Sequence, residues 1–152
     1  MKTIRVAMWS GPRNISTAMM RAWGNRSDTQ VIDEPLYGSY LYQSGKKHPM
    51  YKEIMHAQGT DATKIISHLI TDKLPPGKHI YYQKHMCHHL GDDLYLDWVT
   101  QLNNIFLIRD PRYVLASYIK KHKQVTAKDL AYPQQLKLFN YIRDKCAYPP
   151  MV

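Results

Sequence analysis

The sequence predicts an α/β fold of three layers, in which a mostly parallel sheet is flanked by helices. Short apolar segments of strand length alternate along the chain with segments whose apolar residues recur at helical spacing. This alternation is typical of parallel sheets, because parallel strands need a crossover helix between them. With 152 residues, of which 44% are hydrophobic, the chain can build one core, and we expect residues 1–152 to form a single domain.

The first half of the chain contains two predicted strands and two predicted helices. The strands cover residues 4–9 and 30–33, and the helix between them starts near Ile15. The second helix follows Asp61, a good N-cap, and ends before Pro75-Pro76-Gly77. Residues 36–59 have no clean period and are rich in Tyr, Gly, Ser and Lys. We interpret them as a long active-site loop or a partly helical lid, whose tyrosines either line an acceptor pocket or are ordinary half-buried packing.

The second half contains two more predicted strands, at residues 79–84 and 104–108. Helices are predicted at 94–102, after Asp110-Pro111 and at 133–146. Asp110 is a good N-cap, and Pro111 suits the first helical position. The last helix is expected to carry Leu136, Phe139 and Ile142 on its apolar side. Residues 148–152 have the pattern of a turn entering a further strand, so either the chain is truncated at its C-terminus or an oligomeric partner, such as a second copy, adjoins it; the sequence leaves both open.

Charge and hydropathy narrow the class of partner. The formal net charge is +9, which attracts anions but does not indicate which anion binds. Lysines and arginines are scattered rather than clustered, so nucleic acid is not the expected partner. No apolar run approaches bilayer length, and the chain starts with a strand pattern instead of a signal peptide. We therefore expect a cytoplasmic protein with no membrane partner.

The segment from Val6 to Thr17 predicts an anion site. A strand runs into a tight polar turn that opens a helix, which points backbone N–H groups and a positive dipole end at one place. The side chains of Arg13, Ser16 and Thr17 add donors suited to phosphate or sulfate oxygens. In the ATP-binding pattern G-x-x-x-x-G-K-[ST], a lysine precedes the hydroxyl residue, whereas Ser16 stands there in this chain. ATP or GTP hydrolysis and nucleoside kinase activity are therefore disfavoured.

The same turn resembles that of the sulfotransferase family, which shares the P-loop nucleotide-binding fold. That family uses 3′-phosphoadenosine-5′-phosphosulfate (PAPS) and carries a [PK/PR]-S-G-[ST]-T turn after its first strand. Pro12, Arg13, Ser16 and Thr17 match it, and bacterial sulfotransferase-like proteins share the run Gly-Pro-Arg-Asn-Ile-Ser-Thr. The resemblance implies a P-loop NTPase-like fold and a cofactor-binding role for Arg13, Asn14, Ser16 and Thr17. Asn14-Ile15 replaces the family's Ser-Gly, and Ile is a poor residue if the turn needs a positive φ there.

A second motif supports this resemblance. Sulfotransferases carry R-[ND]-P-x-x-x-x-x-S after a later strand, where the Arg and Ser bind the 3′-phosphate of the cofactor. The run from Arg109 through Asp110-Pro111 to Ser117 fits it with the spacing intact. By resemblance, Arg109 and Ser117 are cofactor-binding residues. Arg109 also follows a predicted strand, and ligands bind at the carboxyl ends of strands in open α/β sheets.

Four residues are candidates for catalysis. Glu34 follows the second strand, where some sulfotransferases place a glutamate base. Lys84-His85 is similar to the family's Lys-x-His element, which implies a cation at Lys84 and a base at His85; His88 is close enough to be a further candidate. The adjacent residues Cys87, His88 and His89 cannot easily face one ion, so we expect no metal. The other histidines are expected at the surface: His48, His56, His68, His79 and His122.

Taken together, these residues predict a sulfotransferase-like protein that moves a sulfuryl group from PAPS to an acceptor hydroxyl or amine. The acceptor is expected to be a small molecule or a saccharide. The alternative is a non-catalytic nucleotide-binding protein of the same fold.

Overall fold

Four parallel strands form the centre of the computed structural model, which describes residues 2–91, 94–120 and 124–152. The strands are β1 (Ile4–Ser10), β2 (Thr29–Asp33), β3 (Ile80–Met86) and β4 (Asn103–Leu107), in the order β2-β3-β1-β4. Met8 of β1 lies opposite Lys84 of β3 and Ile105 of β4. The predicted α/β class with a parallel sheet is therefore confirmed.

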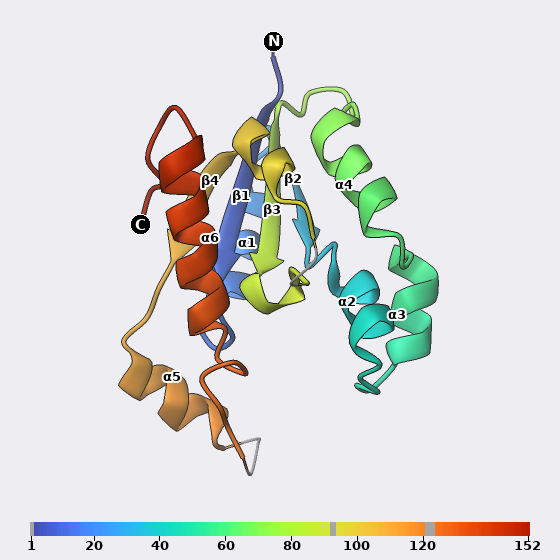
Figure 1. Ribbon diagram of the computed structural model, residues 1–152. Helices are drawn as coiled ribbons and strands as arrows, with labels where there is room; N and C mark the ends of the chain where they lie inside the picture. The colour runs from blue at the N-terminus through green and yellow to red at the C-terminus, as the bar shows by residue number, and fades with distance from the viewer. Residues whose placement is uncertain (1, 92–93, 121–123) are drawn as a thin grey trace.

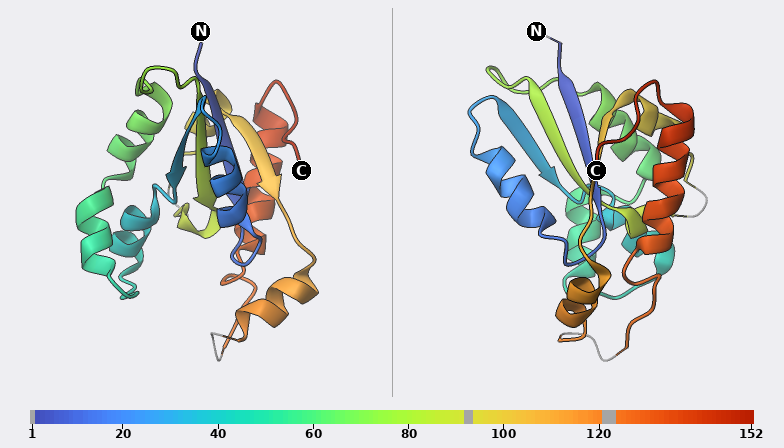
Figure 2. Two further views of the ribbon diagram at one scale, coloured as in Figure 1. Left: turned by 180° about the vertical axis from the view of Figure 1, so that it is seen from behind. Right: turned by 90° about the vertical axis from the view of Figure 1, so that its left-hand side faces the viewer.

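Helices cover both faces of this sheet and give it three layers (Figures 1 and 2). Strand side chains alternate between faces. Val6, Met8 and Tyr82 pack toward α1 (Ser16–Gly24), which contributes Met20. Ala7 and Trp9 point the other way, toward a larger core. That core includes residues of α4 (Ala62–Thr71) and α6 (Tyr132–Lys145), among them Ile66, Leu138 and Ile142.

Two predicted helix starts are confirmed by their caps. The Asp61 side chain accepts a hydrogen bond from the Lys64 N–H at the start of α4. Asp110 does the same for the Arg112 N–H at the start of α5 (Pro111–Tyr118), which follows β4. Each cap satisfies a backbone donor that the first helical turn leaves unpaired.

Of the two alternatives for residues 36–59, the partly helical one is confirmed, because the segment forms two helices packed on each other, α2 (Tyr37–Ser44) and α3 (Tyr51–Gln58). Two other predictions about local structure need correction. Residues 94–102 form only a short 3₁₀ segment, η2 (Asp97–Gln101), in place of a helix. Ile142 is buried on α6 as predicted, but Leu136 is exposed and Leu138 takes its place in the core.

The predicted turn toward a further strand is present as one bridge. Met151 pairs in parallel with Ile105 on the free side of β4. The Phe106 N–H donates to the Met151 carbonyl at 2.8 Å, and the Met151 N–H donates to the Asn104 carbonyl at 3.1 Å. No helix in the described ranges is long and apolar enough to cross a bilayer.

The carboxyl ends of the strands all point to one end of the molecule. There α5 lies beyond the sheet and α2 lies to one side, with the 3₁₀ segment η1 (Cys87–His89) between them (Figure 1). Because β1, β3 and β4 end here, the residues that follow them are brought together despite their distance in sequence.

Candidate active site

The turn between β1 and α1 has an unusual backbone. Arg13 has φ 64° and Ile15 has φ 54°, both in the left-handed region, and Ile15 immediately precedes α1. Left-handed residues alternating with right-handed ones direct successive N–H groups into a concave anion-binding nest. No side chain caps α1, and its first turn carries no acidic residue. The turn therefore presents unneutralised donors, as an anion site requires.

The second motif meets this turn directly. The Arg109 guanidinium donates to the Arg13 carbonyl at 3.0 Å, and the Arg13 Nε donates to Ser117 Oγ at 2.9 Å. The Asn14 side chain is buried, and its amide donates to the Leu107 carbonyl at 3.4 Å at the end of β4. The fold thus bends α5 over the turn, so that Arg13 and Ser117, far apart in sequence, are in contact.

The predicted cofactor-binding residues line one pocket of about 290 Å³. Its walls are Arg13, Asn14, Ile15, Ser16, Thr17, Arg109 and Ser117. Two guanidinium groups and three hydroxyls face a common space with no carboxylate among the described lining residues. Guanidinium and hydroxyl donors are the groups that phosphate and sulfate oxygens accept from, so the donor set fits a nucleotide with two anionic ends.

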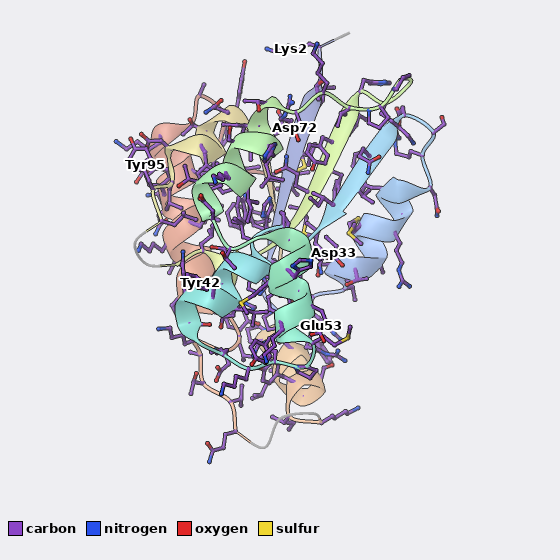
Figure 3. The ribbon with its side chains drawn as sticks, turned by 90° about the vertical axis from the view of Figure 1, so that its right-hand side faces the viewer. Lys2, Asp33, Tyr42, Glu53, Asp72 and Tyr95 are labelled. Carbon is purple, nitrogen blue, oxygen red and sulfur yellow. The ribbon has the colours of Figure 1, made fainter. Side chains whose placement is uncertain are left out.

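Glu34 and Lys84 form an ion-pair cluster with Asp33 at the carboxyl ends of β2 and β3. The Lys84 ammonium lies 2.8 Å from an Asp33 oxygen and 2.5 Å from a Glu34 oxygen. Lys84 is 3% exposed, whereas Asp33, labelled in Figure 3 at the end of β2, is half exposed. Two carboxylates pair with one buried ammonium group, and this pairing offsets the free-energy cost of burying its charge. The fold thus brings Lys84 and Glu34 together. Lys84 lies opposite Met8, on the face of the sheet that α1 covers.

His85 lies apart from this cluster. It points to the opposite face of the sheet, where its ring stacks on Trp9 with centroids 4.4 Å apart and contacts the Gln83 side chain at 3.2 Å. Complete burial lowers the pKa of His85 to about 3. Successive side chains of a strand point to opposite faces of the sheet, so His85, which directly follows Lys84, points to the other face. We therefore assign it a packing role.

His88 lies in η1, at the wall of a second cavity of about 480 Å³. Burial, with the nearby cations, lowers the pKa of His88 to about 4, so its imidazole is neutral at pH 7. Its Nδ1 is buried and has no hydrogen-bond partner in the described part of the chain. A neutral imidazole has one nitrogen that can accept a proton, but a pKa of about 4 makes His88 a weak base at pH 7.

The second cavity joins a residue that the sequence offered with residues that it did not single out. Tyr40, one of the tyrosines interpreted either as pocket lining or as half-buried packing, lines it. His48 also lines it, although it was expected at the surface, and lies 2.7 Å from the Tyr37 hydroxyl. The stretch 124–134 supplies the rest of the wall and has no motif or period that could have identified it. Residue His122 lies outside the described residues. No group of three or more His, Cys, Asp or Glu suited to a metal occurs within 2–91, 94–120 and 124–152.

The fold and the site together define an α/β protein whose guanidinium and hydroxyl donors line one pocket at the carboxyl ends of its strands. The chain belongs to the sulfotransferase domain family, whose model matches residues 4–146. This confirms the family that the two motifs indicated.

Two curated relatives come from Arabidopsis thaliana. One is named branched-chain-amino-acid aminotransferase-like protein 2 and is 32% identical over 118 residues, which is 75% of this chain and 20% of the relative. The other, protein 1 of the same name, is 32% identical over 114 residues with the same coverage. The chain therefore spans about a fifth of the length of these relatives.

Proposed function

We propose that this domain binds PAPS and transfers its sulfuryl group to an acceptor hydroxyl or amine. The observation that carries the proposal is the single pocket formed by residues of both sulfotransferase motifs. The nucleotide supplies the sulfuryl group, and the chain supplies the groups that bind it and that take up the acceptor's proton. The relatives' aminotransferase names describe proteins of which the matched segment is only 20%, so the proposal does not extend that activity to this chain.

The binding roles follow from the position of each donor. Ser16 and Thr17 open α1 at the nest, so we assign them, with Arg13 and Asn14, to the 5′-phosphosulfate end. Arg109 and Ser117 reach the same pocket from the β4–α5 side and are assigned to the 3′-phosphate. The Arg13–Ser117 hydrogen bond joins the two halves and preorganises them before a ligand binds.

Two residues remain as candidates for the base that takes the acceptor's proton. His88 lines the cavity, so its imidazole is placed near a ligand bound there, although a pKa of about 4 makes it a weak base. Glu34 is engaged in an ion pair with the Lys84 ammonium and lines neither this cavity nor the pocket of the two motifs. We therefore favour His88 as the base and propose that Lys84 and Glu34 stabilise the strand ends around the site.

Binding of adenosine 3′,5′-bisphosphate, measured by isothermal titration calorimetry, tests the nucleotide site. We expect Arg109→Ala and Arg13→Ala each to weaken binding by at least about tenfold, because a charge-assisted hydrogen bond contributes about 1.5–3 kcal/mol. Arg112→Ala is the matched control: Arg112 is on the same helix start, is highly exposed and pairs with Asp110 outside the pocket. It should bind like the wild type.

Two results would refute this proposal. One is equal affinity of the wild type for ATP and for the bisphosphate; the other is an Arg109→Ala variant that binds the bisphosphate as well as Arg112→Ala does. Bisphosphate binding without transfer of labelled sulfate from PAPS to any acceptor in a cell extract would select the non-catalytic alternative.

A further inference from the structure

We infer that the 480 Å³ cavity beside the anion pocket is the acceptor site, and that it selects a hydroxyl-rich acceptor bearing a carboxylate, such as an acidic saccharide. The inference rests on the proposed sulfuryl transfer. It adds the chemical class of the acceptor, which neither the family nor the relatives' names supply.

The cavity is next to the anion pocket. Consecutive residues at the end of α5 divide the two spaces, since Ser117 lines the pocket and Tyr118 lines the cavity. The segment 126–131 also lies against the turn, because a Cβ placed on Gly11 would be 2.5 Å from the Leu130 carbonyl oxygen. Both spaces therefore open at the carboxyl ends of the strands, where a group could pass from one ligand to the other.

Every residue of the cavity wall carries a polar group. Its lining residues are Tyr40, Lys46, His48, His88, Tyr118, Gln124, Thr126, Lys128, Asp129 and Gln134. None of these ten carries a purely aliphatic side chain, so the wall offers few aliphatic groups to a steroid or an acyl chain. The tyrosine and histidine rings instead supply flat surfaces with polar tips, which suit the alternating C–H and hydroxyl groups of a sugar ring.

Two lining residues each carry a buried atom that has no hydrogen-bond partner in the described part of the chain. These atoms are His88 Nδ1 and Gln134 Oε1. Buried polar atoms are nearly always paired in folded proteins, and each unpaired one costs about 1–3 kcal/mol. An amide oxygen can only accept hydrogen bonds, so Gln134 Oε1 needs a donor such as a hydroxyl. A hydroxyl-rich ligand would remove this cost at each atom that a side-chain rotation turns into the cavity.

The charge of the wall favours an acidic ligand. Lys46 and Lys128 are its two cations, and neither has a carboxylate within ion-pair distance in the described ranges. The one carboxylate, Asp129, already accepts from the Thr126 N–H at 2.8 Å and the Thr126 hydroxyl at 2.7 Å. Lys46 lies over the Tyr40 ring, 5.3 Å from its centroid, which holds the ammonium at the cavity. A carboxylate on the acceptor would complete this charge pattern.

The test uses the full chain saturated with adenosine 3′,5′-bisphosphate and three probes: methyl β-D-glucuronide, methyl β-D-glucoside and 2-naphthol. Affinities are measured by saturation-transfer NMR titration. The two glycosides differ only in the carboxylate, and we expect the glucuronide to bind about tenfold more tightly. Lys46→Met should abolish this preference, whereas the matched control Lys47→Met, an exposed neighbour outside the cavity wall, should keep it.

A second variant tests the hydroxyl contacts separately. Gln134→Leu keeps the approximate size of the side chain but removes its acceptor oxygen, and we expect both glycosides to bind at least about threefold more weakly. The inference is overturned if the glucoside binds as tightly as the glucuronide, if 2-naphthol is preferred, or if Lys46→Met and Lys47→Met behave alike. Bisphosphate binding with no glycoside binding refutes this inference alone; absence of bisphosphate binding refutes the proposed function.

Discussion

Ile15 adopts a conformation that β-branched residues rarely take. Its φ of 54° lies in the left-handed region, where the Cβ approaches the following carbonyl oxygen. The side chain is 63% exposed, so little apolar burial offsets this strain. The turn nevertheless keeps the geometry that directs N–H groups toward an anion, because α1 and the Arg13 contacts hold it on both sides. Strain kept at a ligand-binding turn is typical of functional sites.

Replacing Ile15 by Gly should raise the stability of the protein. The left-handed conformation costs a non-glycine residue about 1–2 kcal/mol, and the extra backbone freedom of Gly in the unfolded chain cancels roughly half of that. We expect Ile15→Gly to increase the free energy of unfolding by about 0.5–1 kcal/mol in urea titrations. Ile15→Ala is the control, because it removes the same side chain but keeps a Cβ. Equal stability of the two variants would contradict the strain argument.

The position of helix α5 depends on hydrogen bonds at its two ends. The helix stands away from the sheet (Figure 2), and Val114 is its one buried residue. Its N-terminal side is held by Arg109 on the Arg13 carbonyl, and its C-terminal side by Ser117 on the Arg13 side chain. The segment 126–131 closes the arrangement from the other side by packing its backbone on Gly11. The site is therefore a contact between connecting segments, supported by strands that end beneath it.

Gly11→Ala should separate these segments. The added methyl group would lie 2.5 Å from the Leu130 carbonyl oxygen, and backbone cannot rotate away as a side chain can. We expect a loss of about 1–3 kcal/mol in stability and weaker bisphosphate binding. Gly24→Ala is the matched control: its methyl group would meet the Val31 side chain at 3.5 Å, an ordinary contact. That variant should unfold at the same or a slightly higher temperature, since Ala is favoured over Gly in a helix.

The molecule as a whole buries histidines around the end of β3. Burial lowers the pKa of His85 to about 3 and of His88 to about 4, and it lowers that of His89 well below the usual value. His89 stacks on both Tyr37 and Tyr40, with centroids 4.7 and 4.8 Å away. These rings are neutral in the folded protein and become charged when the chain unfolds in acid. The core is therefore a source of acid sensitivity.

We expect the free energy of unfolding to be greatest above about pH 6.5 and to fall as the pH decreases from there toward 4. In that window the unfolded chain binds protons that the folded protein does not, so each buried histidine removes about 1 kcal/mol between pH 6 and pH 5. His89→Phe keeps the ring stack without a titrating group and should reduce this loss by about 1 kcal/mol in urea titrations at the two pH values. His56→Gln, at an exposed position, should leave the slope unchanged. A His89→Phe profile as steep as the wild type would contradict the assignment.

The sequence by itself determined the parallel α/β class, most helix positions and the motif residues that line one pocket. Strand length, helical spacing and the caps at Asp61 and Asp110 are local signals, and the motif residues from Arg13 to Thr17 and from Arg109 to Ser117 occur at readable spacings. The bounds of α2 and α3 were not predicted beyond a partly helical segment, because their apolar residues lack a clean period. Tertiary contacts between the two helices stabilise them instead.

Only the tertiary structure decided which candidates share a site. Whether His85 or Lys84 faces a given side depends on the phase of β3 in the sheet, and a shift of one residue exchanges the two faces. The cavity wall joins residues of α2, η1, α5 and the segment 124–134, which no spacing in the sequence connects. The contact between Arg13 and Ser117 likewise required β1 and β4 to lie side by side, because long-range pairing is set by the packing of the whole core.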